Sequence, residues 1–327
     1  MIIDMHCDTL LNLRTKEYDL ENVKGHISLD KLIKSNYLVQ CFAVFTYLKY
    51  VKDPKNYVNE MIEAFKYNMN KFSDKIKQVY SYDDIIKNKE NNIISALLTI
   101  EELGVIHEVE ELDGLYKEGV RMATLTWNFA NDFAYPAWEY INKETPPIIQ
   151  PKKGLTEKGI KLVKRMEELG IIIDVSHLNV KSFYEVLEQN PKNLIASHSN
   201  AYTISNHRRN LNDDQLKKLP ELKAYVGLNS ARNFVSYDKA KQNLNGLIDQ
   251  MIYIADKIGI EHVMLGLDMM HFLDDFGDSP NLDDLTCHKD VSNLEGLMLK
   301  RGFSKKEIDM VGYLNYFQAI KNVKSRG

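Results

Sequence analysis

The chain opens with Met1-Ile2-Ile3-Asp4-Met5-His6-Cys7-Asp8, a short apolar run that becomes polar at its end. The run Ile2–Cys7 predicts a buried strand, with His6 and Asp8 at its C-terminal end. Because side chains alternate along a strand, His6 and Asp8 would point to the same side and could bind one ion together. Alone, a His-x-Asp pair is weak evidence, because a single His is usually structural and a single Asp often caps a helix.

The same pattern recurs along the chain, and amphipathic stretches separate the apolar runs. Runs such as Ile171-Ile172-Ile173 are continuously apolar, which is typical of strands covered on both faces. The predicted strands are Ile2–Cys7, Leu38–Phe45, Ile93–Glu101, Arg121–Thr126, Ile171–His177, Leu194–His198, Ala224–Asn229 and Val263–Asp268. Strands alternating with helices over this length predict an α/β fold, a (β/α)8 TIM barrel, as one domain over residues 1–327. A doubly wound sheet is the alternative, but His6-Cys7-Asp8-Thr9 stands where it would need a Gly-rich turn.

Several helices between the strands carry clear end signals. Thr156 is predicted to cap a helix that Gly170 ends, and an apolar face beginning at Leu247 is followed by a stop at Gly259. The capping box Ser304-Lys305-Lys306-Glu307 predicts the start of another helix. These signals support regular alternation of strands and helices.

Composition limits the classes of partner. A formal net charge of −4 and a pI near 6.2 argue against nucleic-acid and anionic-membrane partners, which would favour a basic face. No apolar run approaches the roughly 18 residues that span a bilayer, and the N-terminus shows no secretion signal. We therefore expect either a cytoplasmic protein or one from which a leader has been removed. The three cysteines are too few for a disulfide framework, and Cys7 and Cys41 are predicted to be buried small hydrophobes.

Polar residues end most of the predicted strands. In a barrel, these C-terminal ends face one mouth, where such enzymes keep their active sites. The residues are His6, Asp8, Glu101, His177, His198 and Asp268. Burying such groups together without a metal would cost several kcal/mol, so the joint pattern predicts a metal site.

The ligand types indicate which metal. Three imidazoles and two carboxylates suit zinc-like ions better than Mg²⁺ or Ca²⁺, which prefer oxygen ligands. They also exceed one tetrahedral catalytic site, so two ions sharing a bridging carboxylate, with an open position for a bridging hydroxide, is the expected arrangement.

The chain resembles the membrane (renal) dipeptidase family, peptidase family M19, within the amidohydrolase-like metal-dependent hydrolases. The resemblance runs over nearly the whole length. It rests on Ile3-Asp4-Met5-His6-Cys7-Asp8, Leu98-Thr99-Ile100-Glu101, Gly119-Val120-Arg121, Leu125-Thr126-Trp127-Asn128, Ile173-Asp174-Val175-Ser176-His177, Ala196-Ser197-His198-Ser199-Asn200-Ala201, Arg208-Arg209-Asn210-Leu211 and Leu265-Gly266-Leu267-Asp268.

The resemblance implies a dipeptidase with two divalent metal ions, with zinc as the expected metal, and it suggests a homodimer. It places one ion on His6 and Asp8, a second on His177 and His198, and Glu101 as the bridging, catalytic carboxylate between them. Asp268 would act as the acid/base group facing the substrate amine and the bridging hydroxide. Arg209 would bind the substrate carboxylate, for which a guanidinium is well shaped.

The chain departs from the family pattern near the substrate. Trp127 replaces a His that mammalian members carry and that is thought to support the carbonyl oxyanion, so His207 or Asn128 would have to take that role. Asp268-Met269-Met270-His271 replaces Asp-Phe-Asp-Gly, and Glu102 occupies a usual Gly position. Trp127 and Asn128 are therefore candidate substrate contacts, and the long stretch Trp127–Leu155, which has no convincing helix, is predicted to cover the site.

Two alternatives stay open on the same residues. The site could hydrolyse another amide or ester, such as an N-acyl-amino acid or a lactone, or the barrel could keep its metals without catalysis. Four further histidines, His26, His107, His262 and His288, are expected to be surface or structural residues.

Overall fold

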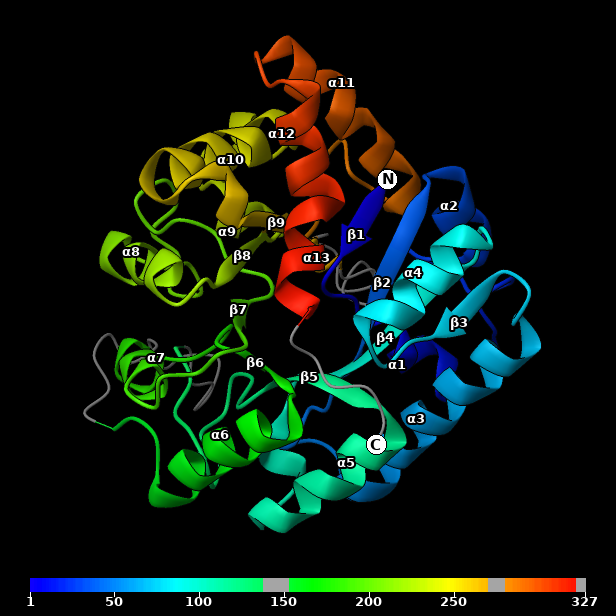
Figure 1. The fold of residues 1–327 in the computed structure, drawn as a ribbon, viewed down its shortest axis with the longest axis vertical. Helices are drawn as coiled ribbons and strands as arrows, with labels where there is room; N and C mark the ends of the chain where they lie inside the picture. Colours follow the sequence, from blue (N-terminus) through cyan, green and yellow to red (C-terminus); the bar gives the residue numbers. More distant parts are fainter. Residues whose placement is uncertain (138–152, 270–279, 322–327) are drawn as a thin grey trace.

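The computed structural model describes residues 1–137, 153–269 and 280–321, and its parallel strands close into a barrel. β1 pairs with β2 on one side and with β9 on the other; β2 pairs with β4, and β4 to β9 follow in order. Figure 1 shows the helices arranged around these strands. The strands are β1 Ile2–Asp4, β2 Tyr37–Val44, β3 Ile76–Gln78, β4 Ile94–Ile100, β5 Val120–Thr124, β6 Ile172–Asp174, β7 Leu194–Ala196, β8 Tyr225–Leu228 and β9 Val263–Leu265. The predicted (β/α)8 TIM barrel is confirmed.

The crossover segments contain the helices that cover the barrel. They are α1 Leu10–Leu13, α2 Leu29–Lys34, α3 Pro54–Lys71, α4 Tyr82–Glu90, α5 Leu112–Glu118, α6 Glu157–Leu169, α7 Val180–Leu187, α8 Asp213–Glu221, α9 Arg232–Val235, α10 Leu244–Ile258, α11 Ser292–Lys300, α12 Lys305–Asp309 and α13 Asn315–Ile320. Thr156 caps α6 by accepting the Gly159 N–H, and Gly170 ends it at φ 75°. The capping box at Ser304 and the stop at Gly259 are also observed. Within the described ranges, no helix has both the length and the apolar character needed to cross a bilayer.

The structure corrects the strand boundaries, and it adds one strand. β1 ends at Asp4, β6 at Asp174, β7 at Ala196 and β9 at Leu265, so the predicted extensions to Cys7, His177, His198 and Asp268 are wrong. The polar residues therefore lie on the loops that follow the strands, and strand alternation does not explain why His6 and Asp8 converge. β3, which the sequence pattern missed, is a short strand that pairs with β4 at Ile94–Ala96, where β5 does not.

Apolar side chains fill the inside of the barrel. Barrel strands contribute Ile3, Val39, Cys41, Leu97, Met122, Ile172, Ile195 and Met264 to one buried cluster. Tyr316, Phe317 and Ile320 of α13 belong to the same cluster, so the C-terminal helix packs against the filled interior. Cys7 and Cys41 are buried free thiols, as predicted.

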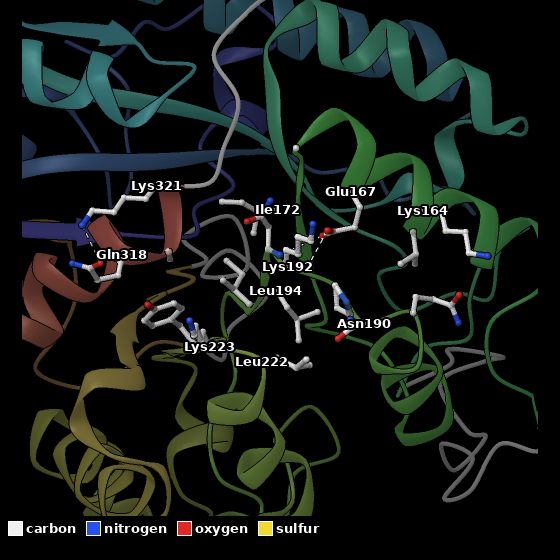
Figure 2. Close-up of a pocket in the computed structure, with 18 of the residues that line it drawn as sticks. Lys164, Glu167, Ile172, Asn190, Lys192, Leu194, Leu222, Lys223, Gln318 and Lys321 are labelled. Carbon is white, nitrogen blue, oxygen red and sulfur yellow. Dashed lines mark hydrogen bonds between the residues drawn. The ribbon is translucent and has the colours of Figure 1, made fainter.

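A cavity of about 1030 Å³ lies at the N-terminal ends of the strands, where Ile172 begins β6 and Leu194 begins β7 (Figure 2). It is lined by charged side chains including Lys164, Lys192 and Lys223, and by no predicted site residue. This end is opposite to the carboxyl ends, so the cavity is separate from the candidate site.

Candidate metal centre

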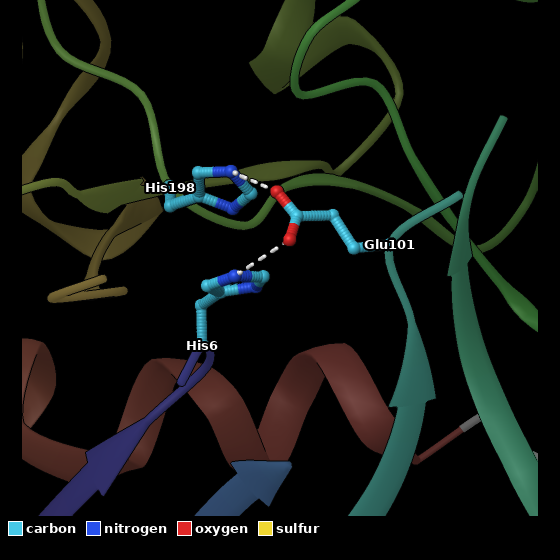
Figure 3. Close-up of side chains that lie close together, drawn as sticks. All are labelled: His6, Glu101 and His198. Atoms are coloured by element: carbon cyan, nitrogen blue, oxygen red, sulfur yellow. Dashed lines mark ion pairs between the residues drawn. The ribbon is translucent and has the colours of Figure 1, made fainter. Parts of the chain in front are cut away.

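Glu101, the residue after β4, lies at the middle of the candidate metal centre. Its Oε1 is 2.9 Å from His177 Nε2 and 3.5 Å from His198 Nε2, while its Oε2 is 3.3 Å from His6 Nε2. Figure 3 shows Glu101 between His6 and His198, with one oxygen directed to each ring. A carboxylate that offers its two oxygens to different histidines has the geometry of a bridging ligand.

The His6 side of the centre is rich in carboxylates. His6 Nε2 lies 3.5 Å from Asp8 Oδ1 and 3.7 Å from Asp268 Oδ1. His6, Asp8 and Asp268 form one group that could hold a metal ion, and His6, Glu101 and His198 form another. All of these side chains are buried.

Asp4, the last residue of β1, fixes the loop that carries His6. Its Oδ1 accepts the backbone N–H of His6 at 3.3 Å and that of Leu267 at 2.8 Å. Its Oδ2 accepts Gln40 Nε2 at 3.3 Å and His288 Nε2 at 3.0 Å. Asp4 thereby ties the loop after β1 to the loop after β9, which carries Asp268.

Asp174, the last residue of β6, has the same role on the other side. Its Oδ1 accepts the backbone N–H groups of Ser176 and Ser197, and its Oδ2 accepts Thr124 Oγ1 and Ser197 Oγ. Because Ser197 Oγ donates to Asp174, it must accept from His198 Nδ1, 2.6 Å away. This chain of hydrogen bonds puts the ring proton of His198 on Nδ1 and leaves the Nε2 lone pair available to a metal.

Asn128 orients the ring of His177. Its Oδ1 lies 3.0 Å from His177 Nδ1, so Nδ1 carries the proton and Nε2 faces Glu101. His177 has φ 70°, an uncommon backbone conformation for a residue other than Gly, and it directs the side chain toward the centre. Gly266 is required nearby, because a Cβ there would lie 1.7 Å from the Ser197 carbonyl oxygen.

The two sides differ in their electrostatics. Burial lowers the pKa of His6, but the Glu101 and Asp8 carboxylates outweigh it and leave that pKa well above its usual range. Burial, assisted by the positive charges of Arg209 and His6, leaves the pKa values of His177 and His198 well below their usual range. Burial also raises the pKa of Glu101 well above its ordinary value.

Asp268 approaches the centre from the loop after β9. Its Oδ2 accepts a hydrogen bond from Asn229 Nδ2 at 2.8 Å, and its backbone has φ 51°. Burial raises the pKa of Asp268 to about 6, although His6, Asn229 and Arg209 oppose the increase. A buried carboxyl group with this pKa can gain and lose a proton near neutral pH.

Arg209 places a buried cation beside the centre. Its Nη2 donates to the His198 carbonyl oxygen at 3.3 Å, its Nε has no hydrogen-bond partner, and no carboxylate of the described residues lies within 4 Å of the guanidinium. Burial lowers the pKa of Arg209 to about 10. A cavity of about 640 Å³ is lined by both Arg209 and His177.

His207 lies beside Arg209, where its Nδ1 accepts the Arg209 backbone N–H at 3.2 Å and its ring packs on Phe234 at a centroid distance of 4.1 Å. Burial, with Arg209 and Arg208, lowers its pKa to about 3, so the ring is neutral at physiological pH. Among the other histidines, His107 is exposed, while His288 is fully buried against Asp4 and so has a structural position.

Trp127 lies over the His177 side of the centre. Its ring centroid is 6.1 Å from that of His177, and its backbone N–H donates to Glu102 Oε2 at 2.9 Å. The predicted covering loop Trp127–Leu155 contains no helix in its described parts, and its residues Trp138 and Pro146-Pro147 lie outside the described ranges. Met270 and His271, which follow β9, also lie outside them.

The structure thus brings all the predicted ligand residues together, and it adds residues that the sequence argument passed over. Asp4, Asp174 and Ser197 orient the candidate ligands. The repeated order of an Asp ending a strand and a His two or three residues later was the available signal, in Asp4-Met5-His6 and Asp174-Val175-Ser176-His177.

Comparison with known proteins identifies relatives along the whole chain. An uncharacterized dipeptidase of Schizosaccharomyces pombe is 29% identical over an alignment 347 positions long, which covers 94% of this chain and 80% of that protein. The solved structure of a dipeptidase of family M19 superposes with a TM-score of 0.86 at 21% identity over 98% of both chains. A metallo peptidase from Rhodobacter sphaeroides, solved with a phosphinate mimic of the dipeptide L-Ala-D-Ala, gives a TM-score of 0.86 at 19% identity over 99% of both chains. At these identities, the two structures show a shared fold.

The sequence model of one family, described as membrane dipeptidase (peptidase family M19), matches residues 1–326. The match includes every residue of the candidate centre. The chain therefore belongs to peptidase family M19, a family of metal-dependent dipeptidases.

Proposed function

We propose that this chain is a dipeptidase with two metal ions, one held by His6 and Asp8, the other by His177 and His198, and both by Glu101. One observation carries the proposal: the two oxygens of the buried Glu101 carboxylate face histidines on opposite sides, at 3.3 Å and 2.9 Å. A structural ion pair would need only one of these partners.

The donor atoms fit metal ions. His6 Nε2, Asp8 Oδ1 and Glu101 Oε2 are buried without a hydrogen-bond partner, a costly arrangement unless a ligand satisfies them. The hydrogen bonds of His177 and His198 leave a lone pair on each Nε2. Imidazole and carboxylate donors favour a zinc-like ion, so we propose Zn²⁺. Two bound divalent ions would supply a water molecule of lowered pKa as nucleophile and would polarise the substrate carbonyl.

Asp268 is the proposed acid/base residue. Its Oδ2 is held by Asn229, while its Oδ1 faces His6 at 3.7 Å. In its ionised form the carboxylate can accept the proton of the attacking water, and it can then donate that proton to the departing amine nitrogen. In the protein without metal ions its pKa is about 6, so the group can take either protonation state near neutral pH.

Arg209 is the proposed binding residue for the carboxylate of the substrate. A buried guanidinium without a described carboxylate partner is unfavourable, and a substrate carboxylate would compensate its charge through two parallel hydrogen bonds. The relative from Rhodobacter sphaeroides that binds a dipeptide mimic supports a ligand of this chemical class.

The test is a panel of dipeptides, N-acetyl-amino acids and lactones, assayed with and without a chelator. We expect chelator-sensitive cleavage of dipeptides that returns when Zn²⁺ is added. Arg209→Ala should lower kcat/KM for dipeptides by about a hundredfold or more, because the buried charged contact is lost, while Arg165→Ala, a surface arginine paired with Asp113, should not.

Each alternative predicts a different result. Faster cleavage of lactones or N-acyl-amino acids than of any dipeptide would replace the dipeptidase proposal with the other amide or ester hydrolase. No cleavage of any compound by protein that contains both ions would favour a non-catalytic metal-binding barrel.

A further inference from the structure

Four aromatic side chains meet at the mouth of the barrel. Phe45 and Tyr47 follow β2, and Trp127 and Phe129 follow β5. The Trp127 ring centroid lies 4.5 Å from that of Tyr47, 5.0 Å from that of Phe45 and 5.6 Å from that of Phe129. We call these four residues the aromatic wall.

The aromatic wall is partly accessible. Its members Phe45 and Phe129 are buried, whereas Tyr47 and Trp127 are partly exposed. Trp127 also approaches the ring of His177. A partly exposed indole beside a metal ligand leaves apolar surface that a ligand could cover.

The wall lies across the barrel mouth from the proposed polar contacts of the substrate. β2 and β5 flank β4, the strand that leads to Glu101, whereas Arg209 and Asp268 lie on the loops after β7 and β9. A dipeptide with its carboxylate on Arg209 and its scissile bond beside Asp268 would have a side chain available to face the wall. None of the four aromatic residues offers a carboxylate or a cation, so the wall suits an apolar side chain.

Glu102 holds Trp127 in this position. Its carboxylate is fully buried and accepts three hydrogen bonds, from the backbone N–H groups of Gly104 and Trp127 and from Asn131 Nδ2, at 2.7 to 2.9 Å. Asn131 in turn donates to the Leu125 carbonyl oxygen, so both ends of the turn that carries Trp127 are fixed. The two departures from the family pattern, Glu102 and Trp127, are thus joined by a direct hydrogen bond.

We propose that the aromatic wall is a specificity subsite that selects dipeptides with a bulky apolar side chain, and that Glu102 is the positioning residue for its indole. This inference rests on the proposed dipeptidase function. It goes further by naming the class of dipeptide and the residues that select it.

The first experiment measures kcat/KM for two series of dipeptides on the zinc-loaded protein. One series is Gly, Ala, Leu or Phe followed by Ala, and the other is Ala followed by the same four residues. In one series, wild type should prefer Leu or Phe over Gly by about tenfold or more. Trp127→Ala should lower that preference, measured as the ratio of kcat/KM for the bulky and the Gly-containing substrate, by about tenfold, and Tyr47→Leu should lower it less. The matched control is Tyr67→Leu, which removes an exposed aromatic ring of α3 and should keep the preference.

The second experiment tests Glu102 through a double-mutant cycle. Glu102→Gln replaces one accepting oxygen by a donor, so it should lower the preference for Leu or Phe through KM of the bulky substrate. In a Trp127→Ala background, Glu102→Gln should change the preference no further, because its effect passes through the indole. A purely structural role would instead lower the rate on every substrate in both backgrounds.

The outcomes separate this inference from the proposed function. Equal rates on all dipeptides, or a preference that survives both Trp127→Ala and Tyr47→Leu, would overturn the aromatic wall and leave the dipeptidase proposal standing. If zinc-loaded wild type cleaves no dipeptide, the proposed function fails and the aromatic wall fails with it.

Discussion

The His6–Asp8 half and the His177–His198 half of the candidate metal centre share one construction. In each, an Asp ends a barrel strand, its Oδ1 accepts two backbone N–H groups, and its Oδ2 accepts two side-chain donors. Asp4 joins the loops after β1 and β9 in this way, and Asp174 joins those after β6 and β7. Each buried carboxylate thus holds two neighbouring loops in place where the short strands end.

The two halves differ in charge. The His6 half contains His6 among the carboxylates of Asp8, Glu101 and Asp268, so its imidazole has a raised pKa. The other half has two neighbouring imidazoles with lowered pKa values and a buried arginine nearby. In the His6–Asp8 half, a proton on His6 would therefore compete with a metal ion. The His177–His198 half offers neutral imidazoles, which a metal ion can bind without displacing a proton.

The largest expected effect comes from removing one imidazole from either half. His198→Ala and His6→Ala should each lower the metal content from about two ions per chain toward one, since each side chain is proposed to serve one ion only. We expect kcat to fall by about a thousandfold in each variant, because the proposed reaction uses both ions. Elemental analysis after dialysis, together with dipeptidase assays, measures both quantities. His107→Ala, an exposed histidine on the surface, is the control. If His198→Ala retained two ions per chain, His198 would not be a metal ligand.

The next prediction concerns the two carboxylates that support the halves. In Asp174→Asn, the new amide would donate toward Ser197, whose hydroxyl would then donate to His198 Nδ1 and move the ring proton to Nε2. The lone pair that binds the metal would be blocked. In Asp4→Asn, the ring proton of each proposed ligand should stay on the same nitrogen, because Asp4 bonds to the backbone N–H of His6 and not to its ring. We expect about a hundredfold loss of affinity for one ion in Asp174→Asn and about tenfold in Asp4→Asn.

Competition with a chelator of known affinity measures both variants, with unfolding curves to separate metal affinity from stability. Equal losses would show that the proton position on His198 is unimportant and that the two carboxylates only hold loops.

The fold and the composition of the site could be predicted from the sequence because both depend on local patterns. Continuous apolar runs identified the barrel strands, and each polar residue that followed a run reached the same mouth. The predicted strands were too long because backbone hydrogen bonding ends sooner than the apolar pattern does. Val175, for example, is buried and apolar but follows the end of β6.

The network that orients the ligands could not be predicted in the same way. The contact between Asp4 and His288 joins residues 284 positions apart, and the one between Trp127 and Glu102 joins adjacent barrel loops. β3 was missed because Lys77 and Gln78 interrupt any apolar run. Long-range hydrogen bonds of single polar residues leave no periodic pattern in a sequence.

The last expected effect, about tenfold in metal affinity for each pH unit, is the response of the two halves to acid. In the metal-free protein the pKa of His6 is raised, so as the pH falls below that pKa the imidazole becomes protonated and cannot bind a metal. Apparent affinity for the ion of this half should then fall by about tenfold per pH unit. The pKa values of His177 and His198 are lowered, so these imidazoles stay neutral at the same pH. The pKa of Glu101 is also raised, but its carboxylate is proposed to serve both ions, so its protonation does not distinguish the two halves. Dialysis of the zinc-loaded protein at pH 8, 6 and 5 should therefore pass through a state with one ion per chain.

The two histidine variants test the order of loss. His198→Ala keeps the ion of the His6–Asp8 half, which is sensitive to acid, so it should lose that ion at a higher pH than His6→Ala loses the ion of the His177–His198 half. Simultaneous loss of both ions, or the reverse order in the two variants, would contradict the difference in charge between the halves.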